Sequence, residues 1–267
     1  MKKLPIGLQN LREMRTEGYA YVDKTPFVAQ LAEQGKYYFL ARPRRFGKSL
    51  FVDTLAEAFA GSRELFEGLY LEDHWDWSRS YPVLRFDFGR GEAHSATALE
   101  DKIAYQINSQ AEALGVSLTE MDLGNRFDQF INRLAGTAGQ PVVVLIDEYD
   151  KPILDNLNNP PLAQALREVL KSFYSVLKGL DAHLKFVFLT GVSKFSKVSL
   201  FSDLNPRVAT LCGYTEVDDD GDGQKTLDQI KSKGYHQPYA SQPVTLISIN
   251  FSTEQRNLSR FAWERVE

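Results

Sequence analysis

The stretch PVVVLIDEYD, residues 141–150, places the strongest limit on how this chain can fold. Its first half is an unbroken run of apolar, mostly β-branched residues, and its second half is acidic. A run that is apolar at every position, rather than at alternate ones, is typical of a parallel strand covered on both faces. We therefore expect a sheet with helices on both sides and carboxylates at the carboxyl end of its central strand.

The rest of the chain up to residue 191 supports this expectation. Short apolar runs predict further strands at 36–41, 81–89 and 184–191, and apolar residues at helical spacing predict helices at 48–61, 97–114, 126–135 and 162–179. Strands that alternate with helices favour a parallel sheet. The predicted fold class is α/β, a three-layer sandwich with a mostly parallel sheet.

The segment FLARPRRFGKSLF, residues 39–51, lies where a predicted strand passes into a predicted helix. Backbone N–H groups at such a helix start bind phosphate, a lysine there reaches the β- and γ-phosphates, and a hydroxyl holds Mg²⁺. The usual phosphate loop (P-loop) has a glycine five residues before Gly47, where this chain has Arg42. We expect the contacts to ATP from Arg42, Pro43, Arg45, Phe46, Gly47, Lys48, Ser49 and Leu50.

Acidic and hydroxyl side chains follow two other predicted strands. Asp147 is expected to bind Mg²⁺ together with Ser49, and Glu148 to act as the base that activates water. In FLTGVSK, residues 188–194, Thr190, Ser193 or Lys194 is placed to sense the γ-phosphate. Each pattern alone has a plain structural explanation: an exposed helix start, a solvated strand end, a strand exit. The three patterns occur in the order expected along the chain, and each follows a predicted buried strand. Together they favour a nucleotide site.

Composition narrows the class of protein. The chain has 267 residues, 43% of them hydrophobic and 25% charged, and a net charge of −4, so its overall field does not attract nucleic acid. Its one cysteine, Cys212, excludes an internal disulfide and suits a reducing compartment. The longest strongly apolar run, 142–146, is far shorter than the roughly 20 residues of a membrane span. We expect a cytoplasmic protein that does not interact with membranes.

The character of the sequence changes after Glu216. Residues 217–225, VDDDGDGQK, predict an acidic, glycine-rich linker, followed by a short helix at 226–235, a strand at 243–251 and a polar tail. The linker matches half of a calcium-binding loop, but Gln229 stands where a glutamate is needed. The four histidines are dispersed, which argues against a zinc site.

Several motifs together resemble the bacterial AAA-ATPase-like family: YVDKTPFVAQL, FLARPRRFGKSL, YPVLRFDF, VVLIDEYDKPI, FLTGVSKFSKVSLFSDLN and RVATLCGYTE. The resemblance covers about residues 4–216 and implies a P-loop ATPase domain over 1–216. Lys48 and Ser49 then belong to its Walker A motif, and Asp147 and Glu148 to its Walker B motif.

Members of this family continue into a nuclease-like domain of the PD-(D/E)XK type. Residues 226–267 look like the remnant end of that domain. No Glu-x-Lys triplet, which such a nuclease needs to hold metal and activate water, follows Glu216. Nuclease activity is therefore not expected.

The resulting hypothesis is Mg²⁺-dependent ATP hydrolysis. Arg42, Arg44 or Arg45 is expected to stabilise the transition state within the chain, with Arg44 and Arg45 as catalytic candidates, or Arg207 to serve a neighbouring subunit of a homo-oligomer. The alternative is an ATP-gated module that binds a protein or nucleic acid and hydrolyses little. A third option, a small-molecule kinase, needs an acceptor pocket that the sequence does not reveal.

Overall fold

The computed structural model describes residues 3–192, 207–208, 228, 231–232, 244–252 and 257–266. The chain divides into two compact units. One consists of residues 7–17 and 21–211, and the other of residues 1–6, 18–20 and 212–267. The larger unit contains the sheet and all the elements that carry the predicted nucleotide site.

The sheet of the larger unit has five parallel strands in the order β2-β3-β4-β1-β5. Their bounds are β1 Tyr37–Ala41, β2 Val83–Asp87, β3 Val142–Asp147, β4 Leu184–Gly191 and β5 Arg207–Val208. The register pairs Asp87 with Asp147 and Ala41 with Gly191, so these strands end along one edge. Loops that leave this carboxyl edge can therefore share a site.

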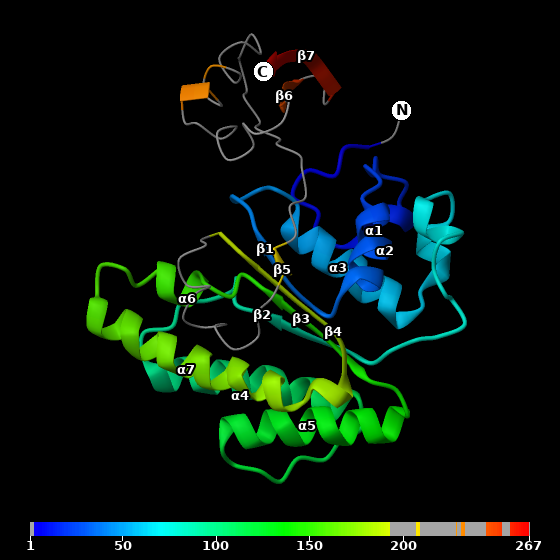
Figure 1. Ribbon diagram of the computed structural model, residues 1–267. Helices are drawn as coiled ribbons and strands as arrows, with labels where there is room; N and C mark the ends of the chain where they lie inside the picture. The colour runs from blue at the N-terminus through cyan, green and yellow to red at the C-terminus, as the bar shows by residue number, and fades with distance from the viewer. Residues whose placement is uncertain are drawn as a thin grey trace. The chain divides into compact units, whose positions relative to one another are not determined.

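Helices cover both faces of this sheet, and Figure 1 shows the three layers. One face packs against α4 Ala96–Ala113, α5 Leu123–Ala138 and α7 Pro160–Gly179. The other packs against α1 Leu11–Thr16, α2 Thr25–Gln34, α3 Lys48–Ala60 and two short 3-10 helices, η1 Arg63–Phe66 and η2 Tyr70–Glu72. The residues described in this unit also form α6 Lys151–Leu154 and η3 Asp181–His183. The α/β prediction is confirmed.

Three fully buried phenylalanines join the sheet to two helices on the α4–α5–α7 face. Phe86 of β2, Phe127 of α5 and Phe173 of α7 have ring centroids 4.5–5.2 Å apart. Aromatic pairs at this spacing stabilise a core beyond the burial of their area. The cluster fixes α5 and α7 against the strand that ends at Asp87.

The edge strand β2 is shielded by two glutamines of α4. Gln110 Oε1 accepts the Arg85 N–H and its Nε2 donates to the Arg85 carbonyl, both at 2.8 Å. Gln106 Oε1 accepts the Asp87 N–H at 2.8 Å. These side chains form hydrogen bonds with the backbone of β2. The same backbone groups could otherwise pair with a strand of another chain.

The smaller unit contains an antiparallel pair, β6 Val244–Ser252 and β7 Asn257–Val266. The strand predicted at 243–251 is confirmed as β6. The polar tail contains a second strand that the sequence analysis did not predict: residues 257–266 form β7 and gain the backbone hydrogen bonds of the pair. The proposed linker, 217–225, lies outside the described residues.

No helix in the described part of the chain is both long and apolar enough to cross a membrane.

Replacing Phe173 by alanine should lower the free energy of unfolding by about 3–5 kcal/mol, because it removes a fully buried ring and leaves a cavity. Tyr105→Ala on α4 is the control, since that side chain is 72% exposed, and it should cost less than about 0.5 kcal/mol. Urea unfolding followed by circular dichroism measures both. Equal losses for the two variants would contradict the proposed packing.

Candidate functional site

The loop from β1 to α3, residues 42–47, contains two left-handed residues. Arg45 has φ 64° and Gly47 has φ 76°, whereas Arg42 is not in the left-handed region. Residue 42 stands where the usual phosphate loop has its first glycine. Its backbone conformation here does not require a glycine. Arg45 adopts a conformation that costs a non-glycine residue of order 1–3 kcal/mol, which is typical of functional loops.

Lys48 is the first residue of α3, and its side chain folds back into the loop. Its Nζ donates to the carbonyls of Arg42 at 3.0 Å and Pro43 at 2.9 Å, and only 6% of the residue is exposed. Burial lowers the pKa of Lys48, while the charges of Asp147 and Glu148 oppose this shift. The predicted lysine and both predicted acids thus lie within electrostatic range of one another.

The amino end of α3 has no side-chain cap, and its first turn contains no acidic residue. The free N–H groups at such a helix start attract an anion. The Leu50 side chain packs against the core. The Ser49 hydroxyl makes no hydrogen bond with the described residues. The loop and helix start are therefore suited to bind phosphate.

Asp147, Glu148 and Thr190 connect the ends of β3 and β4. The Thr190 hydroxyl and the Glu148 N–H both donate to Asp147 Oδ1, the latter at 3.1 Å. The Glu148 N–H also lies 3.2 Å from Thr190 Oγ1. Thr190 is fully buried, and its carbonyl accepts the Tyr149 N–H at 2.9 Å. These contacts fix the orientation of the Asp147 carboxylate.

Glu148 adopts a left-handed conformation, with φ 52°. Its carboxylate lies beside Gly89, where an added Cβ would come within 3.0 Å of Glu148 Oε2 and 2.9 Å of Asp87 Oδ1. The Gly89 N–H donates to Asp87 Oδ1 at 2.7 Å. Burial raises the pKa of Glu148, and the charge of Asp147 adds to the shift. A raised carboxyl pKa among charged groups is typical of a proton-accepting residue.

Asp150 and Gly191 anchor the loop that follows β4. Asp150 is buried, and its two carboxylate oxygens lie 3.0 and 3.3 Å from the Val192 N–H. Gly191 has no room for a side chain, because an added Cβ would lie 2.3 Å from the buried Tyr149 ring. The Gly191 carbonyl accepts the Arg42 N–H at 3.1 Å. The end of β4 therefore contacts both the segment that follows β3 and the start of the loop 42–47.

The loop arginines differ in their surroundings. Arg44 and Arg45 are exposed, and Arg44 contributes to the lowered pKa of Lys48. The Arg42 guanidinium lies 5.5 Å from the Phe46 ring centroid, and the Lys24 ammonium lies 5.7 Å from the same centroid. Cations over aromatic faces are attracted by the ring quadrupole. Phe46 is thus flanked by two cations, one of which comes from outside the predicted motif.

The structure brings Lys48, Asp147, Glu148 and Thr190 together as the sequence suggested. Sequence reasoning missed Asp150, Gly89 and Lys24. Asp150 could have been found as the last acid of the VVVLIDEYD run, and Lys24 as a residue of YVDKTPFVAQL. Ser193 and Lys194, and the side chain of Arg207, lie outside what the structure describes.

No cluster of three or more His, Cys, Asp or Glu side chains in the described residues forms a ready metal site. Mg²⁺ in nucleotide enzymes needs no such cluster, because it is held by one or two protein groups together with phosphate oxygens and water. Asp147 and Ser49 are suitable groups, so the residues present fit a magnesium–nucleotide complex.

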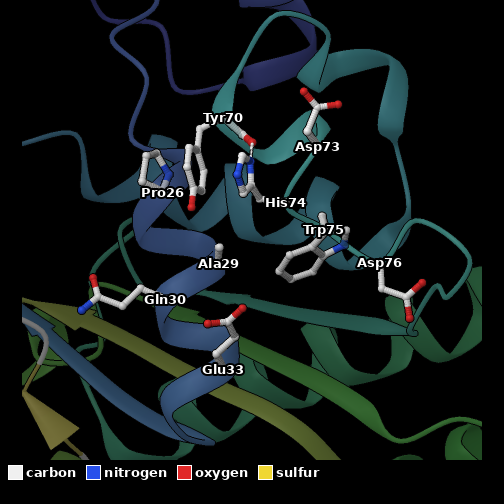
Figure 2. A pocket seen from close by; sticks show the side chains of 9 residues that line it. All are labelled: Pro26, Ala29, Gln30, Glu33, Tyr70, Asp73, His74, Trp75 and Asp76. Atoms are coloured by element: carbon white, nitrogen blue, oxygen red, sulfur yellow. Dashed lines mark hydrogen bonds between the residues drawn. The ribbon is translucent and has the colours of Figure 1, made fainter.

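A separate pocket of about 470 Å³ lies between α2 and the segment after η2. Figure 2 shows the residues that line it. The Tyr70 and His74 rings stack there at 3.8 Å. Glu33, Asp73 and Asp76 line it, with no lysine or arginine and no residue of the loop 42–47. Such an acidic lining repels a triphosphate, so this pocket is not the nucleotide site.

Comparison with known proteins agrees with this geometry. The family described as "Predicted AAA-ATPase" matches residues 5–201. A protein of Azotobacter chroococcum mcd 1, named "Uncharacterized protein in vnfD 5'region", is 54% identical over 228 residues. That match covers 82% of this chain and 44% of the relative, so the chain spans less than half of the relative's length.

Gly191→Ala should lower the free energy of unfolding by about 1–3 kcal/mol, because its methyl group would overlap the buried Tyr149 ring. Gly136→Ala in α5 is the matched control: no atom lies within 4 Å of its added Cβ, and it should stabilise the helix by about 0.5–1 kcal/mol. Urea unfolding distinguishes the two. A Gly191→Ala variant as stable as the parent would show that the contact relaxes freely.

Proposed function

Because this chain belongs to the predicted AAA-ATPase family, we propose that it binds ATP with Mg²⁺ and hydrolyses the bond between the β- and γ-phosphates. The observation that carries the proposal is the arrangement of Lys48, Asp147 and Glu148. A buried lysine at an uncapped helix start lies within electrostatic range of two carboxylates at the end of β3. A bound phosphate chain would balance the charge of Lys48 and accept hydrogen bonds from the free N–H groups at the start of α3. A bound metal ion would balance the charge of the Asp147 carboxylate.

Binding uses the loop and the start of α3. The backbone from Arg45 to Ser49 and the Lys48 ammonium neutralise the phosphate oxygens. Lys48 already donates to two loop carbonyls, so its position is fixed before the nucleotide arrives. Ser49 and Asp147 are the groups that hold Mg²⁺, which when bound neutralises charge on the β- and γ-phosphates.

Hydrolysis needs a water molecule in line with the bond that breaks. The water oxygen forms a bond to the γ-phosphorus, the bond from that phosphorus to the β–γ bridging oxygen breaks, and Glu148 orients the water and accepts its proton. Gly89 leaves room for the Glu148 carboxylate, and the Thr190 hydroxyl orients the neighbouring Asp147. Thr190 remains the proposed residue that senses the γ-phosphate.

Lys48→Ala should abolish ATP binding, because it removes the main buried cation of the loop. Glu148→Gln should retain ATP binding and reduce hydrolysis by about 10²–10⁴-fold, because it removes the proton acceptor and keeps the side-chain shape. Calorimetric titration with ATP and a phosphate-release assay measure the two effects.

The control for these variants is Glu100→Gln, an exposed position on α4 that contacts no part of the site. Hydrolysis by Glu148→Gln at the parental rate would show that another group is the base. Tight ATP binding by the parent without phosphate release, with and without DNA, would favour an ATP-gated binding module instead of an ATPase.

Among the loop arginines, Arg44→Ala should lower the rate of hydrolysis most, because its charge already acts on Lys48. An arginine that stabilises phosphoryl transfer is worth about 10³–10⁵ in rate. The three single variants Arg42→Ala, Arg44→Ala and Arg45→Ala, assayed by phosphate release at saturating ATP, test this order. If all three variants hydrolyse ATP at the parental rate, the loop arginines do not stabilise the transition state, and the positive charge of the loop has another role.

A further inference from the structure

Lys24 belongs to YVDKTPFVAQL, outside the expected Walker A and Walker B motifs, but it lies next to the loop 42–47 in the structure. It immediately precedes α2, and its Nζ lies 3.8 Å from the position that a Cβ on Gly47 would occupy. The same ammonium lies 5.7 Å from the centroid of the Phe46 ring. A second lysine therefore reaches the amino end of α3 from a segment more than twenty residues upstream.

The Lys24 ammonium is half-buried and makes no hydrogen bond or ion pair with the part of the chain that the structure describes. Three other lysines near the sheet have oxygen partners: Lys36 meets Asp181 at 3.0 Å, Lys151 meets Asp155, and Lys48 meets two carbonyls. Lys185 resembles Lys24 in contacting an aromatic ring, but it lies at the other end of the sheet, away from the loop 42–47. Burial also lowers the pKa of Lys24. Burying a cation without an anionic partner is unfavourable, so its placement beside an anion-binding loop calls for a ligand.

The backbone on both sides of Lys24 is held in place. Asp23 accepts the Thr25 N–H through Oδ1 and the Tyr70 N–H through Oδ2, both at 2.8 Å. Thr25 is fully buried, and its Oγ1 accepts the Leu71 N–H at 3.1 Å. These bonds tie Asp23 and Thr25 to η2. Lys24 is therefore presented to the loop by a rigid support, and little of its freedom remains to be lost on binding a ligand.

We propose that Lys24 is a second phosphate-binding lysine, which donates a charge-assisted hydrogen bond to an oxygen of the nucleotide's phosphate chain. The inference rests on the proposed function and adds a residue to its binding site. The simpler explanation is that Lys24 only packs against Phe46. The two differ in one respect: a phosphate contact depends on the phosphates of the ligand, whereas a packing contact does not.

The experiment compares ATP with adenosine as calorimetric ligands for the full chain. Lys24→Gln should weaken ATP binding by about 10–100-fold, the usual worth of a hydrogen bond to a charged group, and should leave the affinity for adenosine unchanged. Lys24→Arg should recover most of the affinity for ATP, because it restores the charge. Raising the salt concentration should reduce the difference between parent and Lys24→Gln.

Lys185→Gln is the matched control. Lys185 is also half-buried and also lies over an aromatic ring, with its Nζ 5.5 Å from the Tyr81 centroid, but it sits at the amino end of β4, away from the loop. This variant should bind ATP as the parent does. If Lys24→Gln fails to fold, Lys24→Met removes the charge and keeps an apolar side chain over Phe46.

The outcomes separate the two proposals. Parental ATP affinity in Lys24→Gln and Lys24→Met, with the parent binding ATP, overturns the role of Lys24 and leaves the proposed function intact. An equal loss of affinity for ATP and adenosine also overturns it, because the residue would then support the fold alone. A parent that binds no ATP overturns the proposed function and the inference together.

Discussion

The contact between Thr190 and Asp147 is the interaction on which the site depends. It joins the carboxyl ends of two adjacent buried strands, and the Glu148 N–H shares the same carboxylate oxygen. With Thr190 fully buried, this hydrogen bond forms in a low-dielectric environment, where it is stronger than it would be in water. It fixes the carboxylate that faces the phosphate loop, and Gly191, the residue after Thr190, fixes the start of that loop through Arg42.

The loop 42–47 shows how a stretch with one glycine can still turn sharply from a strand into a helix. A glycine is expected at position 42, yet Arg42 is not left-handed there, and the two left-handed residues are Arg45 and Gly47. The strain at Arg45 is offset by the contacts of its neighbours, since Lys48 bonds to two loop carbonyls and Phe46 is flanked by two cations. The result is a rigid, strongly cationic loop, which suits a triphosphate and an electrostatic mode of catalysis.

Most of the larger unit's fold followed from local patterns. The four strands predicted before residue 192 and the helices on both faces were confirmed, because buried runs and helical spacing arise from the same burial that forms the core. The elements that the sequence did not predict were missed for physical reasons. β7 has the charged residues Arg260, Glu264 and Arg265, and its strand is stabilised by pairing with β6 rather than by an apolar pattern. The α1 helix and the 3-10 helices η1, η2 and η3 are too short to show a helical period.

By itself, the sequence determined the α/β class, the order of the strands along the chain, and the identity of Lys48, Ser49, Asp147, Glu148 and Thr190 as candidate site residues, because each follows a recognisable buried strand. Only the tertiary structure decided which distant residues join them. Lys24, Gly89 and Asp150 reach the site through strand order, register and the docking of α2 on the sheet. Those relations are set by packing between segments far apart in the chain, and no local pattern of residues encodes them.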